Sequence, residues 1–113
     1  MTFLIHDRRP VPEIGPEIDR LRNLADDLER ICRGDHPSHS MLAGAPILEN
    51  WTMAQRPESC LAGCVSGHPN IGNDRCAITS PLWAFAPTLG YARTLSRFYV
   101  LGEPNLIPQA GRH

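Results

Sequence analysis

Residues 15–34 read GPEIDRLRNLADDLERICRG, and this stretch predicts the long helix of the chain. Pro16 suits the first helical turn, where its missing N–H costs little, and Gly34 is a typical helix stop. Apolar side chains recur every three or four positions, which is the spacing of one helix face: Ile18, Leu21, Leu24, Leu28 and Ile31, followed by Cys32. We therefore predict an amphipathic helix over 16–33, whose apolar face must pack against the rest of the chain or against a partner.

The residues around this helix are less regular. Residues 1–13 include Arg8-Arg9-Pro10-Val11-Pro12, and two prolines so close together favour an extended arm. After Gly34, either Ser38 or Ser40 is suited to cap a short helix through 41–43. Residues 14–50 are thus predicted to form the helical part of the protein.

From Trp51 to Gly102, Gly and Pro recur every few residues, and the segments between them are short. This pattern is typical of small antiparallel strands joined by turns. We predict strands near 51–56, 60–67, 76–84 and 92–101, with turns at 57–58, 72–74 and 87–90. Residues 103–113 are predicted to form a flexible tail.

These elements together predict one α+β domain spanning residues 1–113. A lone sheet of four short strands with both faces wet is not stable. We therefore expect the N-terminal helix to pack on a small antiparallel sheet of four to five strands that curls toward a barrel. Whether the helix covers its own sheet or another chain stays open.

The positive charge of the chain comes from a single residue type. The 113 residues include 11 basic and 12 acidic side chains, a net charge of −1, and every basic residue is Arg. Without Lys, the chain has no Gly-x-x-x-x-Gly-Lys phosphate loop and no Schiff-base chemistry. Residues 1–50 carry six Arg against nine acids, whereas residues 51–113 carry five Arg against three acids. The C-terminal half is therefore mildly basic.

The order of apolar and charged residues also bears on the cellular compartment of the protein. No apolar run approaches the roughly 18 residues that a membrane-spanning helix needs. The N-terminus, MTFLIHDR, places its charge after a very short apolar patch, which is the reverse of a secretory signal. We expect a cytoplasmic protein without membrane association, whose four cysteines are reduced.

Four soft metal ligands lie close together in the sequence: Cys60, Cys64, His68 and Cys76. On a strand, however, positions four residues apart are separated by about 13 Å, too far for two sulfurs to share one zinc ion with bonds of about 2.3 Å. The usual Cys-x-x-Cys knuckle is also missing. We expect no metal or other cofactor, and keep a zinc-stapled structural domain as a weaker alternative.

Arginine and aromatic residues alternate along the second half of the chain. Arg93 and Arg97 lie four positions apart within one predicted strand and are expected on one face. With neighbouring residues they form the candidate binding set, which is Arg75, Trp83, Arg93, Arg97 and Tyr99. Such a surface suits an acidic protein partner, since Arg, Tyr and Trp dominate interface energetics. It also suits single-stranded nucleic acid, while the simplest alternative assigns the aromatic residues to the core.

Several segments resemble a small alphaproteobacterial family known only as a domain of unknown function. The resemblance lies in Asp26–Ile31, Val65–Pro69, Ile78–Trp83 and Ala92–Gly102. It covers most of residues 20–102 and implies no activity. The same Gly-His-Pro and Ser-Arg-x-Tyr rhythm is similar to short barrel proteins of bacterial mobile elements, which implies an inhibitor or accessory role by analogy.

Ser66 and His68 are two positions apart on a predicted strand, a separation of about 6–7 Å that is too long for a nucleophile–base hydrogen bond. We find no other coherent catalytic set. The sequence thus predicts a non-enzymatic protein-interaction or regulatory module. A small β domain that binds single-stranded nucleic acid is the alternative, and the sequence leaves the oligomeric state open.

Overall fold

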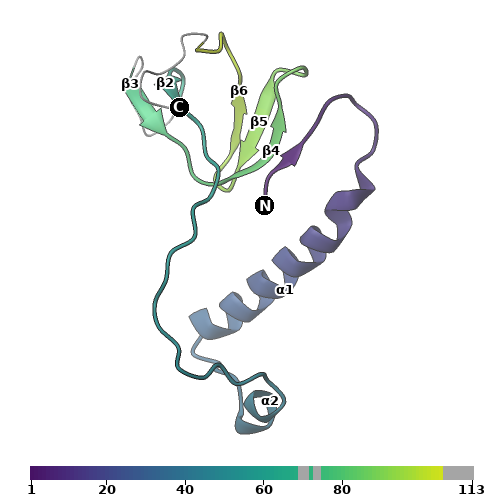
Figure 1. Ribbon diagram of the computed structural model, residues 1–113, viewed down its shortest axis with the longest axis vertical. Helices are drawn as coiled ribbons and strands as arrows, with labels where there is room; N and C mark the ends of the chain where they lie inside the picture. The colour runs from purple at the N-terminus through teal and green to yellow at the C-terminus, as the bar shows by residue number, and fades with distance from the viewer. Residues whose placement is uncertain (69–71, 73–74, 106–113) are drawn as a thin grey trace. The chain divides into compact units, whose positions relative to one another are not determined.

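A computed structural model describes residues 1–68, 72 and 75–105 of the chain (Figure 1). It confirms an α+β fold with one long helix, a four-stranded sheet and a two-stranded sheet. The chain forms two compact units, of which one contains residues 1–9 and 56–113 and the other contains residues 10–55. In the described part of the chain, no helix combines the length and the apolar character needed to cross a bilayer.

The unit of residues 10–55 is helical. A 3-10 turn, η1 (Pro12–Ile14), leads directly into α1 (Gly15–Cys32), which confirms the predicted helix. Gly34 has a φ of +82°, a left-handed conformation that glycine adopts without steric cost. The amide of Asp35 then donates to the carbonyl of Arg30 at 2.8 Å, as expected where a glycine ends a helix.

A second helix follows after a short connection. α2 (His39–Ala43) begins after Ser38, whose side chain accepts a hydrogen bond from the Met41 amide at 3.3 Å. This is the capping interaction that the sequence predicted, and Ser38 makes it.

The larger sheet has the strand order β1–β4–β5–β6 and is mixed rather than wholly antiparallel. It consists of β1 (Phe3–Leu4), β4 (Leu82–Ala86), β5 (Tyr91–Thr94) and β6 (Phe98–Val100). β4, β5 and β6 pair antiparallel in chain order, whereas β1 pairs parallel with β4 (Figure 1). A parallel pair needs a long crossover, and here residues 5–81 supply it.

The core of this unit is small and lies along β4 and β5. Its buried apolar residues are Ile5, Leu82, Ala86 and Ala92, and Thr94 is buried with only 1% of its surface exposed. The predicted turn at 87–90 joins these strands, with the amide of Leu89 bonded to the carbonyl of Ala86 at 3.0 Å. Gly90 has a φ of +83°, which explains why glycine occupies the end of this turn.

β2 (Ala62–Val65) and β3 (Arg75–Ile78) form a separate antiparallel hairpin. At its base the amide of Thr79 donates to the carbonyl of Leu61 at 2.8 Å. The amide of Leu82 donates to the carbonyl of Ser59, also at 2.8 Å, which connects this segment to the start of β4. Residues 73–74 of the predicted 72–74 turn lie outside the described residues.

Three strand predictions were wrong in their extent. Residues 51–56 form no strand, because they have no paired neighbour among the described residues. Residues 76–84 divide into β3 and β4 because Pro81, which lacks an N–H donor, interrupts the ladder. Residues 92–101 likewise divide into β5 and β6, which fold back on each other around Leu95 and Ser96.

Further expectations concerned the N-terminal arm, the closure of the sheet and the C-terminal tail. The predicted arm of residues 1–13 contains β1 and most of η1, so it is partly structured. The sheet is not closed into a barrel, because β1 and β6 lie at opposite ends of the strand order. Of the predicted tail 103–113, residues 106–113 lie outside the described residues.

Candidate functional site

The candidate binding residues come from strands whose register fixes the face each side chain occupies. Across β5 and β6, Arg93 pairs with Phe98 and Tyr91 pairs with Val100. Paired residues of an antiparallel ladder share a face, and alternate residues share a face along each strand. Tyr91, Arg93, Phe98 and Val100 therefore occupy one face of the sheet, which we call the aromatic face.

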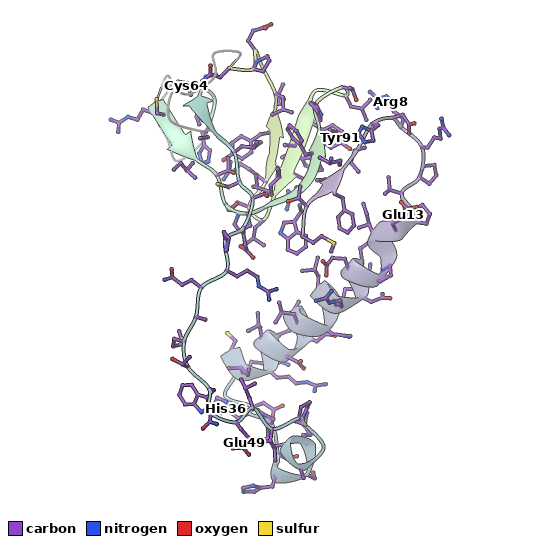
Figure 2. The ribbon with its side chains drawn as sticks, in the orientation of Figure 1. Arg8, Glu13, His36, Glu49, Cys64 and Tyr91 are labelled. Atoms are coloured by element: carbon purple, nitrogen blue, oxygen red, sulfur yellow. The ribbon has the colours of Figure 1, made fainter. Side chains whose placement is uncertain are left out.

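The aromatic face contains two ring contacts. The guanidinium carbon of Arg93 lies 5.1 Å from the centroid of the Phe98 ring, within the range of a cation–π interaction. Tyr91, labelled in Figure 2, meets the same ring edge to face, with centroids 5.8 Å apart. Phe98 thus contacts both a cation and a second aromatic ring.

This face is accessible to a partner. Phe98 exposes 65% of its surface and Val100 exposes 91%, while Arg93 and Tyr91 are partly exposed. Phe98 and Val100 occupy alternate positions of β6 on this face, and adjacent exposed apolar side chains of this kind can contribute to an interaction surface. The guanidinium, held over a ring, offers donors to a carboxylate in a fixed position.

Arg97 does not lie on the same strand face as Arg93, contrary to the sequence-based prediction. It follows the β5–β6 turn, and its carbonyl accepts a hydrogen bond from the amide of Thr94 at 2.9 Å. Its Nε atom is buried and has no hydrogen-bond partner among the described residues. The prediction failed because Leu95 and Ser96 form a turn, so the alternation of one strand does not apply across them.

Thr94 organises that turn. Its hydroxyl accepts hydrogen bonds from the amides of Ser96 at 3.2 Å and Arg97 at 3.3 Å. The same hydroxyl donates to the Arg97 carbonyl at 3.2 Å. The turn is also bonded to the segment before β4, because the hydroxyls of Ser96 and Ser80 are 2.9 Å apart.

Tyr99 lies on the opposite face from Arg93. Its register partner is Ala92, which is completely buried. Its ring lies 6.2 Å from the imidazole ring of His68, measured between centroids. Tyr99 thus contacts the segment after β2 and is separated from the aromatic face by the sheet.

The other two predicted residues lie elsewhere. Trp83 is partly exposed and occupies a register irregularity between Leu82 and Ala84, so strand alternation does not fix its face. Arg75 is exposed at the start of β3, in the separate hairpin. The structure therefore brings Arg93 together with Phe98 and Tyr91, which the candidate set had omitted.

The structure brings two of the four candidate zinc ligands together. Cys64 and Cys76 are register partners across β2 and β3, and their sulfur atoms are 3.6 Å apart. Within residues 1–68, 72 and 75–105, no three His, Cys, Asp or Glu side chains are grouped closely enough to hold a metal ion. The zinc alternative, which needs Cys60 and His68 as well, thus has no support from the described residues.

Two features were missed at the sequence level, although signals for them existed. The pairing of Phe98 with Arg93 follows once Leu95-Ser96 is taken as a two-residue hairpin turn, because register then fixes every pair. The pairing of Cys64 with Cys76 follows in the same way once Ala62 is taken as the partner of Ile78. The first of these errors came from the strand predicted over 92–101, which runs through the turn between β5 and β6.

Comparison with known proteins gives one match. The profile of a family of unknown function (DUF6634) matches residues 18–107, which includes most of α1 and all of β2 to β6. No curated protein and no solved structure matched the chain.

Proposed function

The chain belongs to a family of unknown function (DUF6634), and we propose that it is a non-enzymatic protein-interaction or regulatory module that acts in the cytoplasm. The observation that carries this proposal is the aromatic face, where the exposed Phe98 contacts both Arg93 and Tyr91. Arg and Tyr are among the residues that contribute most to protein interfaces.

The chemistry of the aromatic face favours a particular kind of partner. Phe98 and Val100 provide exposed apolar surface, and Arg93 provides a cation beside it. A protein surface with an apolar patch bordered by a carboxylate would complement both. We therefore propose an acidic, partly apolar protein surface as the ligand.

The edge of the sheet adds backbone groups to this surface. The amide of Leu101 donates to the carbonyl of Gly90, and that of Thr94 donates to the carbonyl of Arg97. Because hydrogen-bonded pairs alternate in an antiparallel ladder, Phe98 and Val100 direct their backbone polar groups away from β5. A partner at the aromatic face can therefore bond to main chain as well as side chains.

Affinity capture with the full chain tests the proposal. The bait is used as wild type, as Phe98→Ser, and as Ile47→Ser, a matched control that replaces an apolar residue exposed by 83% outside the aromatic face. We expect one stoichiometric partner that is retained by the wild type and by Ile47→Ser and is lost with Phe98→Ser. Failure to recover such a partner, with a chain that is monomeric by light scattering, would contradict the proposal.

Binding of nucleic acid is tested with the same full-length chain. Labelled single-stranded RNA and DNA are titrated at low salt with the wild type and with Arg93→Ala. If a complex forms and is weakened by added salt and by Arg93→Ala, the ligand of the aromatic face is a nucleic acid and not a protein.

A further inference from the structure

Cys64 and Cys76 occupy directly opposite positions in the β2–β3 hairpin, and Figure 2 labels Cys64 on β2. Their sulfur atoms are 3.6 Å apart, although the residues are twelve positions apart in the sequence. Both residues are exposed, so a small reagent can reach them. None of this enters the proposed interaction function, and the inference does not depend on it.

The register shows which kind of cross-strand pair they form. Thr79 donates its amide proton to the carbonyl of Leu61, so Leu61 and Thr79 are a hydrogen-bonded pair. Counting along the ladder, Gly63 and Ala77 form the next such pair, and Cys64 and Cys76 are a non-hydrogen-bonded pair. The Cα atoms of such pairs are about 4.5 Å apart, within the range of about 4.4–6.8 Å that disulfides span.

We propose that Cys64 and Cys76 are a modification site, at which a low-molecular-weight disulfide such as oxidised glutathione converts the two thiols into a cross-strand disulfide. The thiolate of one cysteine attacks a sulfur of the reagent and releases one reagent thiolate. The second cysteine then attacks the mixed disulfide and releases the other. The two protein sulfurs lose two electrons and two protons, and the reagent takes them up to become two thiols.

The location of the pair gives the bond a structural consequence. β2 and β3 form a sheet of only two strands, and a two-stranded hairpin on its own is marginally stable in water. A covalent link between the strands removes open conformations from the hairpin. Arg75, which precedes Cys76 in β3, is then held in register with Val65.

The test uses the full chain with Cys32→Ser and Cys60→Ser, which removes the other two exposed cysteines and leaves the pair. The folded protein is treated with oxidised glutathione, blocked with an alkylating reagent and digested with trypsin. Arg75 lies between the two cysteines, so trypsin separates them unless a disulfide joins the fragments. We expect joined fragments from a monomer whose mass has fallen by two hydrogen atoms.

Two comparisons make the result specific. Addition of Cys64→Ser should abolish the joined fragments and leave a mixed disulfide on Cys76. If Cys64→Ser impairs folding, Cys76→Ser is used in its place, and it should abolish the joined fragments and leave a mixed disulfide on Cys64. The folded chain should also form the bond at least about tenfold faster than the same chain in urea, because the fold holds the sulfurs together.

Amide hydrogen exchange supplies a readout of the structural effect. In the oxidised protein, exchange of the β2 and β3 amides should slow by a factor of roughly 10 to 100, as closure of a loop of this length implies. The proposal is overturned by stable mixed disulfides on both cysteines, by links only between separate chains, or by equal rates in folded and unfolded protein.

Discussion

Arg93 and Phe98 face each other across β5 and β6, with the guanidinium carbon 5.1 Å from the ring centroid. This pair joins the two properties on which the aromatic face depends, an exposed apolar ring and a positioned cation. Both belong to short strands joined by a turn, so the contact is local in sequence. It can therefore be measured without knowledge of the partner.

We expect Arg93 and Phe98 to be energetically coupled. A double-mutant cycle with Arg93→Ala and Phe98→Ala should give a coupling free energy of about 0.5–1 kcal/mol, the range for a cation–π pair at an exposed site. The free energy of opening is measured by hydrogen exchange at the β5 and β6 amides. Arg93→Lys should keep part of the coupling, and additive single effects would show that the contact does not form.

The hydroxyl of Thr94 should be essential to the β5–β6 turn. Thr94→Val keeps the shape of this buried side chain but leaves the amide of Arg97 without its acceptor, while the amide of Ser96 keeps the Ser80 hydroxyl at 3.2 Å. We expect a loss of about 1–3 kcal/mol in the free energy of opening, measured by exchange at the β5 and β6 amides.

Thr88→Val is the matched control for Thr94→Val. Thr88 is exposed, and its hydroxyl makes one hydrogen bond, a donation to the His6 carbonyl at 2.9 Å. We expect a loss of about 0.5–1 kcal/mol for this change. Equal losses at the two positions would argue against the special role of Thr94.

The two glycines at the ends of α1 should respond to alanine in opposite directions. Gly34 has a φ of +82°, so Gly34→Ala places a side chain in the left-handed region and should cost about 1 kcal/mol. Gly15 has a φ of −50° and open space where the new methyl group would lie. Gly15→Ala should stabilise the helix by about 0.4 kcal/mol or more, because it restricts the unfolded chain. Thermal melts followed by circular dichroism compare the two, and a common sign would contradict the assignment.

The sequence predicted the long helix from local signals, and it failed where pairing is long-range or where a turn lay inside a predicted strand. Helix α1 was found because spacing, Pro16 and Gly34 all lie within one stretch. β1 was missed because Phe3 and Leu4 become a strand only through parallel pairing with β4, far along the chain. At the candidate site, Arg93 was identified from the alternation of arginine and aromatic residues. Its partner Phe98 was missed because the strand predicted over 92–101 runs through the turn that pairs the two residues.

The apolar face of α1 leads to the last prediction. Its five aligned residues each expose between 36% and 53% of their surface, and they are Ile18, Leu21, Leu24, Leu28 and Ile31. Most of the stability of a helix in a protein comes from packing of its amphipathic face, so we expect burial of this face to contribute to the stability of α1. We therefore expect α1 to be protected in the folded protein or in its complex by a contact that this face makes.

Amide hydrogen exchange on the full chain measures that protection. The central amides of α1 should exchange at least about a hundredfold more slowly than in a peptide of residues 12–35, because tertiary packing stabilises amphipathic helices beyond their intrinsic propensity. Leu24→Ser should reduce the difference, whereas Arg22→Ser, which leaves the apolar face intact, should preserve most of it. If the chain alone shows no protection but gains it when the captured partner is added, the face is covered by that partner. Unprotected amides in both states would show that the face is not buried, and the amphipathic spacing would then need another explanation.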